Sequence, residues 1–128
     1  MKKLSQNQAL ELALDTLQKN GATKENALPL ARGIIDVVPN WAEGWNKRAT
    51  VLYLMGRYQD SLNDIDEVLK RESRHFGALS GQGLVQTELK NYEKAIESYQ
   101  AVQKIYPSIK SAKIMIPQLQ ELIKEKTI

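Results

Sequence analysis

The chain has 128 residues, of which 42% are hydrophobic and 26% charged, values typical of one globular domain and not of a disordered or membrane-embedded chain. Cysteine is absent, which excludes disulfides, cysteine-bound metals and thiol catalysis, and the single histidine, His75, excludes a multi-histidine metal site. The net charge of +3 arises from 18 basic and 15 acidic residues that interleave along the chain, so no basic stripe suited to nucleic acid is present.

The N-terminal residues argue against a secretory signal. Polar residues between Ser5 and Asp15 interrupt the apolar core that would have to follow Met1-Lys2-Lys3. No stretch approaches the roughly 18 apolar residues of a membrane span. If Met1 is the natural start, we expect a cytoplasmic protein that acts without a membrane.

Three landmarks recur at equal spacing along the sequence: Pro39, Ser73 and Pro107. The period of about 34 residues is one that helical repeat proteins use. It divides the chain into a degenerate unit at 5–39, units at 40–73 and 74–107, and a terminal helix at 108–128. Each unit is long enough for two helices and a turn.

The first unit is the least regular. Ser5 with Gln8 has the spacing of a capping box, and leucines 10, 14 and 17 follow at helical spacing until Gly21. Pro29 lies in the second half of the unit and is expected to kink that helix or to delay its start.

The second unit predicts helices at 41–55 and 58–71. Asn40 with Glu43 has the spacing of a capping box for the first helix, and Gly56 suits a left-handed turn after it. The second helix is expected to direct its apolar stripe inward: Ser61, Leu62, Ile65, Val68 and Leu69. Its acidic residues, Asp60, Asp64, Asp66 and Glu67, depart from the spacing of a calcium loop and are expected on a solvated face.

The third unit repeats the pattern, with helices expected at 75–89 and 92–105. His75 falls at the start of the first helix, where it can cap the helix or face water. The last helix, at 109–126, is expected to bury one face, containing Ile116, Leu119, Leu122 and Ile123, and to bend at Pro117.

The spaced residues Trp45, Ala49, Gly56, Tyr58, Ser61, Ile65 and Val68, and again Gly83, Tyr92, Ala95, Tyr99 and Pro107, resemble the pattern of the tetratricopeptide repeat family. The stretches 45–50 and 74–81 are also similar to a group of small bacterial members, which suggests a bacterial origin. The resemblance implies an all-α, right-handed superhelix of about three helical pairs and a C-terminal capping helix, in which the first helix of each pair lines a concave groove.

Projection of the first helices onto that groove gives the candidate partner-binding residues. They are Glu43, Asn46, Lys47, Thr50, Tyr53 and Leu54 from one helix, and Gly77, Ser80, Gly81, Leu84, Thr87 and Glu88 from the next. The preceding unit would add Leu12, Thr16 and Lys19, and the capping helix Ser111, Ile114 and Met115. This mixed wall suits a short peptide or a partner helix.

Gly77 and Gly81 lie four residues apart on one helical face, where propensity favours almost any other residue. Either their missing side chains open a pocket beside Tyr53 and Leu84, or they relieve crowding against a neighbouring pair. Some members of the family bind acidic chaperone tails through a clamp of Lys, Asn and Arg. Lys47 and the two glycines stand at clamp positions here, so the clamp lacks its basic half.

The sequence therefore predicts a protein-interaction module that binds a protein or peptide, with no catalytic residues, no cofactor and no metal. No nucleophile with a base and an orienting acid is evident around His75. The alternative is a structural protein that self-associates through Leu4, Ile114, Met115 and Ile128. We expect a monomer or a weak homodimer.

Overall fold

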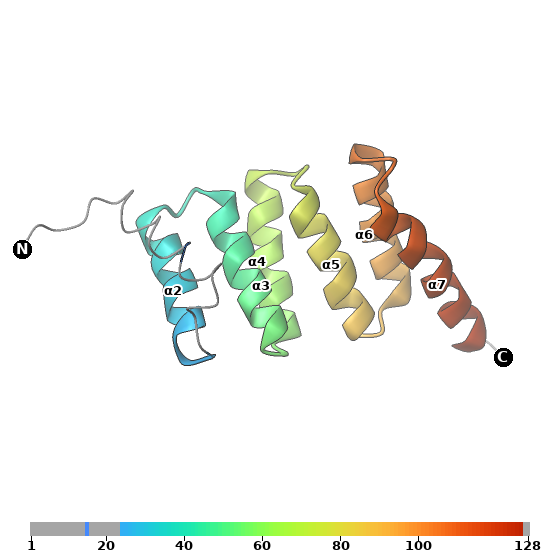
Figure 1. Ribbon diagram of the computed structural model, residues 1–128, viewed down its shortest axis with the longest axis horizontal. Coiled ribbons are helices and arrows are strands. Elements are labelled where there is room, and N and C mark those ends of the chain that lie inside the picture. Colours follow the sequence, from blue (N-terminus) through green and yellow to red (C-terminus); the bar gives the residue numbers. More distant parts are fainter. Residues whose placement is uncertain (1–14, 16–23, 127–128) are drawn as a thin grey trace, which may run out of the picture.

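The computed structural model describes Asp15 and residues 24–126. Within 24–126 the chain forms α-helices joined by short turns: α2 (Lys24–Val37), α3 (Ala42–Leu54), α4 (Tyr58–Arg71), α5 (Phe76–Glu88), α6 (Tyr92–Ile105) and α7 (Lys110–Lys126). The helices follow one another along the long axis of the molecule (Figure 1). The predicted all-α architecture is confirmed for this part of the chain. Predictions that concern Leu4, Ser5, Gln8, Leu10, Leu12, Leu14, Thr16, Leu17, Lys19, Gly21 and Ile128 lie outside the described residues.

Consecutive helices pack against each other, α3 against α4, α5 against α6 and α6 against α7, and α4 also contacts α5. The turns between pairs are equally spaced and fall at positions 39–40, 73–74 and 107–108. Pro39, Ser73 and Pro107 lie in these turns.

The core is distributed along the array. One buried cluster joins α3, α4 and α5 and contains Ala42, Ala49, Leu62, Ile65, Val68, Ala78 and Val85. A second joins α6 and α7 and contains Ala95, Tyr99, Ala112 and Leu119. Each helical pair thus buries its apolar face against its neighbours, as in a solenoid, and not around one centre.

The helix boundaries agree closely with the sequence. The ends of α4 and α6 are those predicted, and α3 and α5 are shorter by one residue at each end. The predicted Asn40–Glu43 capping box is wrong: Trp41 is the N-cap of α3, and no side chain caps it. Glu43 instead contacts His75 of the next unit. The proposed delay of α2 at Pro29 is also wrong, because α2 begins at Lys24.

In both units, a left-handed residue lies in the turn between the first and the second helix. Gly56 has φ of 77°, as its position predicted, and Lys90, at the equivalent position of the next unit, has φ of 62° without being glycine. A side chain in this region costs roughly 1–2 kcal/mol. The turn geometry is therefore kept in the third unit at some expense of stability.

Gly83 permits the close approach of α5 and α6. A Cβ atom at this position would lie 2.7 Å from Cζ of Tyr99, whose ring is buried against the glycine. Gly83 is therefore a position where the missing side chain lets the two helices pack closely.

The α7 helix closes the array. Ala112 and Leu119 are buried against α6, whereas Ile114 is 56% exposed. Leu122, expected on the buried face, is exposed. The helix continues through Pro117, and most of its exposed residues are polar, which suits a terminal repeat.

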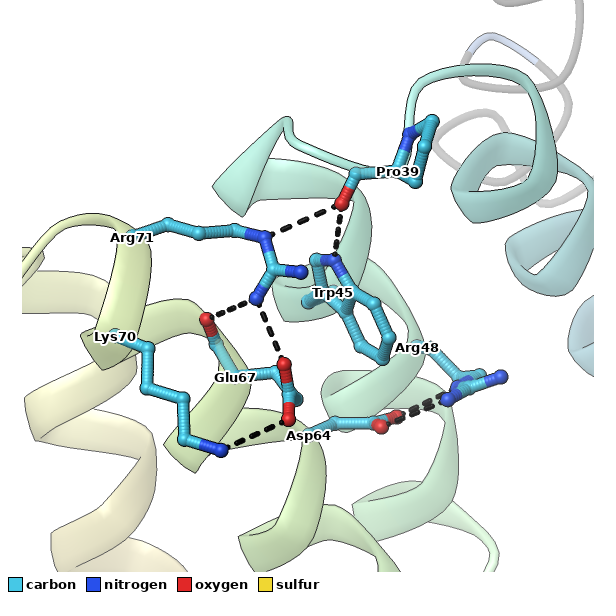
Figure 2. Close-up of polar contacts among 7 residues, drawn as sticks. All are labelled: Pro39, Trp45, Arg48, Asp64, Glu67, Lys70 and Arg71. Carbon is cyan, nitrogen blue, oxygen red and sulfur yellow. Dashed lines mark hydrogen bonds and ion pairs between the residues drawn. The ribbon is translucent and has the colours of Figure 1, made fainter.

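Asp64 is the largest departure from the expected burial. Its side chain is only 6% exposed, not on a solvated face, and it accepts two hydrogen bonds from Arg48 of α3 (Figure 2). A buried carboxylate requires such a partner. The contact raises the pKa of Arg48 through the hydrogen bonds to Asp64.

Trp45 and Arg71 join this unit to the preceding turn. The indole nitrogen of Trp45 and Nε of Arg71 both donate to the carbonyl oxygen of Pro39, across 2.9 and 3.2 Å (Figure 2). The guanidinium of Arg71 also lies over the indole ring, 4.7 Å from its centre, and donates to Glu67. Trp45 of α3 and Arg71 of α4 therefore both hold the α2–α3 turn against this helical pair.

Candidate functional site

A pocket of about 290 Å³ lies between α3 and α5, with α4 as its floor. Its walls are Asn46, Ala49, Thr50, Tyr53 and Leu54 from α3 and Gly77, Ser80, Gly81, Leu84 and Val85 from α5, and its floor is Ser61 and Ile65 from α4. No charged side chain lines it. The volume leaves room for one large apolar side chain.

Eight of the twelve groove residues predicted on these two helices line this pocket: Asn46, Thr50, Tyr53, Leu54, Gly77, Ser80, Gly81 and Leu84. Glu43 and Lys47 lie nearer the N-terminal end of α3 and bind each other across 3.7 Å. Thr87 donates a hydrogen bond to the carbonyl of Gly83 within its own helix. Sequence reasoning missed the floor, because Ser61 and Ile65 belong to the apolar stripe of α4 and were assigned to the core.

The two glycines have different surroundings. A Cβ at Gly77 would lie 3.1 Å from the imidazole of His75, so a side chain there is crowded. A Cβ at Gly81 would meet only Cδ1 of Ile65, at 3.7 Å, an ordinary contact. Packing therefore does not require glycine at position 81, and the missing side chain leaves the pocket open.

At the N-terminal end of the groove, Glu43 and His75 link the two units. His75 Nδ1 accepts a hydrogen bond from the backbone N–H of Ala78, which caps α5, and Nε2 lies 2.8 Å from a carboxylate oxygen of Glu43. Since Nδ1 accepts, Nε2 carries the proton and donates to Glu43. Burial acts to raise the pKa of Glu43, but hydrogen bonds from His75 and Asn46 outweigh it and the pKa is lowered.

At the opposite end, the groove has an apolar and acidic rim. Leu54 is 75% exposed and Leu84 44%. The Tyr53 ring packs against Tyr58, with 5.7 Å between the centres. Burial raises the pKa of the Tyr53 hydroxyl, and the nearby carboxylate of Glu88 raises it further.

Comparison with known proteins agrees with this geometry. The family model described as a tetratricopeptide repeat matches residues 46–108. A TPR repeat-containing protein of Rhizobium etli is 36% identical over 104 residues, which cover 78% of this chain and 51% of that protein. The chain belongs to the tetratricopeptide repeat family.

Solved tetratricopeptide repeat domains share the fold. The domain of Arabidopsis OM64 has a TM-score of 0.83 at 17% identity, covering 91% of this chain and 98% of that domain. The first such domain of Spaghetti (RPAP3), bound to the HSP90 peptide SRMEEVD, has a TM-score of 0.83 at 15% identity, covering 94% and 97%. At these identities the likeness establishes the fold.

Among curated relatives, the chain spans about half the length of the Rhizobium etli protein. It spans a tenth of tetratricopeptide repeat protein 12 of Mus musculus, which is 36% identical over 67 residues. Tetratricopeptide repeat domains are protein-interaction modules.

A second cavity, of about 480 Å³, lies among α2, α3 and α4, away from the groove. Its lining includes Arg48 and Arg57, whose guanidinium groups are bound to Asp64 and Asp60 respectively. The charges of Arg48 and Arg57 are therefore paired within the protein. In the described part of the chain no cluster of three ligand-type residues could hold a metal ion, and no helix is long and apolar enough to cross a membrane.

Proposed function

We propose that this tetratricopeptide repeat array binds a segment of a partner protein and catalyses no reaction. The segment lies in the groove between α3 and α5 and inserts one uncharged, apolar side chain into the pocket. The observation that carries this proposal is the open, uncharged pocket at Gly81, where packing does not require a glycine.

The energetics favour an apolar anchor. Burial of one Leu, Met or Phe side chain is worth roughly 1.5–3 kcal/mol. Asn46 and Ser80, at the pocket wall, offer hydrogen bonds to the backbone of the segment. Exposed Leu84 and Leu54 extend the apolar surface beyond the pocket.

Chaperone tails are poor candidates for this groove. The solved relative binds an HSP90 peptide that is rich in Glu and Asp. The pocket here carries no Lys or Arg, and Lys47, at a clamp position, is bound to Glu43. An acidic tail would therefore lose its hydration without gaining a basic partner.

The test is selection from a displayed library of random 12-residue peptides on the full chain. Gly81→Leu should abolish binding of the selected peptides, because its side chain fills the pocket. The control is Gly33→Leu on α2, where a Cβ meets no atom within 4 Å. Peptides that bind Gly81→Leu as tightly as the parent chain would refute the pocket as the binding site.

Self-association is the second candidate, because the apolar side chain of Ile114 on α7 is 56% exposed. Met115 packs into the α6–α7 cluster and is less available. Light scattering over a range of concentrations tests this candidate. A mass that rises with concentration and returns to that of a monomer in Ile114→Ser would support assembly over peptide binding.

A further inference from the structure

The charged groups around the groove are not all paired. Glu43 is bound to His75 and lies 3.7 Å from Lys47, so the N-terminal end of the groove is internally neutralised. Glu88, at the C-terminal end of α5, is exposed and makes no hydrogen bond or ion pair with the described residues. Its carboxylate is therefore available to a partner.

Glu88 is close to the pocket along the helix. It lies one turn beyond Leu84, which lines the pocket, and seven residues beyond Gly81. Seven residues of α-helix span about 10 Å, a distance that an extended peptide covers in about three residues. A segment anchored at Gly81 thus passes Glu88 a few residues later.

The surroundings of Glu88 favour a long basic side chain. Leu84, one turn before Glu88 on the same helix, is 44% exposed. The methylene groups of Lys or Arg can cover such apolar surface while the charged end reaches a carboxylate. An acidic residue at the same place would meet Glu88 directly and be repelled.

We propose that the bound segment carries a Lys or Arg about three residues from its apolar anchor, and that Glu88 binds this residue. The inference rests on the proposed function and specifies the chemistry of the occupant. It assigns to Glu88, a predicted groove residue outside the pocket lining, the role of determining charge specificity.

The experiment uses one library-selected peptide in two synthetic forms, with the basic residue kept or replaced by Gln. Dissociation constants are measured by fluorescence polarisation for the parent chain, Glu88→Gln and Glu88→Lys. Glu97→Gln is the matched control, since Glu97 is an exposed carboxylate on α6 outside the groove pocket.

We expect Glu88→Gln to weaken the basic peptide about three- to fivefold, as an exposed ion pair would. Glu88→Lys should weaken it about tenfold and leave the Gln form almost unchanged. Glu97→Gln should affect neither form. The difference between the two peptides should shrink from 50 to 300 mM salt.

Two results would overturn the inference and leave the proposed function intact. One is a set of Gly81-dependent peptides with no preference for Lys or Arg near the anchor, or with equal affinity for the parent chain and Glu88→Lys. The other is Gly81-dependent binding that stays equally tight when the basic residue of the selected peptide is replaced by Glu. If no selected peptide depends on Gly81, the proposed function and this inference are both wrong.

Discussion

The guanidinium of Arg48 donates two hydrogen bonds, of 2.7 and 2.9 Å, to the nearly buried carboxylate of Asp64. In the next unit, Gln82 and Ser98 occupy the same two positions, and the Ser98 hydroxyl donates to the Gln82 side chain across 2.8 Å. The same contact between the two helices of a unit is thus an ion pair in one unit and a neutral hydrogen bond in the next. The ion pair and the neutral hydrogen bond can therefore be compared within one protein.

Exchange of the ion pair for the neutral pair should cost less than removal of its basic half. We expect Arg48→Gln to lower the free energy of unfolding by about 3 kcal/mol, because it leaves the Asp64 charge buried without its partner. Asp64→Ser should cost about 1 kcal/mol, since Arg48 can reach water. The double variant should resemble the next unit and cost about 1 kcal/mol.

Urea denaturation of the parent, both single variants and the double variant measures the coupling between the two positions. Additive losses would show that the two side chains do not interact in solution.

The glycines of α5 should respond in opposite directions to alanine. Gly83→Ala should destabilise the fold by about 2 kcal/mol, because its Cβ would lie under 3.0 Å from carbons of the Tyr99 ring. Gly81→Ala, two residues earlier, should stabilise it by about 1 kcal/mol through helix propensity. Thermal unfolding of the two variants provides the comparison. Equal shifts would contradict the close packing of α5 on α6.

Repetition made most of the fold predictable from the sequence. The repeat period and the apolar stripe of Ser61, Ile65 and Val68 were enough to place α4 and α6 to the residue. The capping contact of α3 could not be predicted in this way. Glu43 binds His75, 32 residues away, and a local capping pattern cannot reveal such a partner.

Burial of Asp64 also escaped the sequence, since acidic residues in a helix usually face water. A signal did exist. Asp64 lies within the inward stripe, three residues after Ser61 and four before Val68, and it aligns with Ser98. The groove walls were predictable because they follow the register of the first helices. The floor was not, because residues such as Ile65 serve both the core and the pocket.

The contact between Glu43 and His75 should make the free energy of unfolding depend on pH in the acidic range. Its pKa in the folded chain lies below the ordinary value of 4.5, so the unfolded chain binds the proton more tightly. The stabilisation is therefore complete above pH 4.5 and is lost as the pH falls through the lowered value. We expect Glu43→Gln to cost about 1 kcal/mol at pH 7 and progressively less as the pH falls below 4.5. Urea denaturation at pH 7, 5.5, 4 and 3 measures the difference.

His75→Asn supplies the control for this prediction. Asparagine is a favourable N-cap, so α5 stays capped while Glu43 loses its partner. In this background the cost of Glu43→Gln at pH 7 should fall to less than half. A cost that is independent of both pH and His75 would contradict the role of the contact.

The two left-handed turns offer a last comparison, because equivalent positions carry Gly56 and Lys90. Gly56→Ala should destabilise the chain by about 1 kcal/mol, since φ of 77° places its new Cβ against the backbone. Lys90→Gly should stabilise it by up to about 1 kcal/mol, because relief of the same strain exceeds the entropy that glycine adds to the unfolded chain. Thermal unfolding at two salt concentrations separates this effect from loss of the lysine charge, which salt would screen. Destabilisation by Lys90→Gly at both concentrations would show that the turn is not strained.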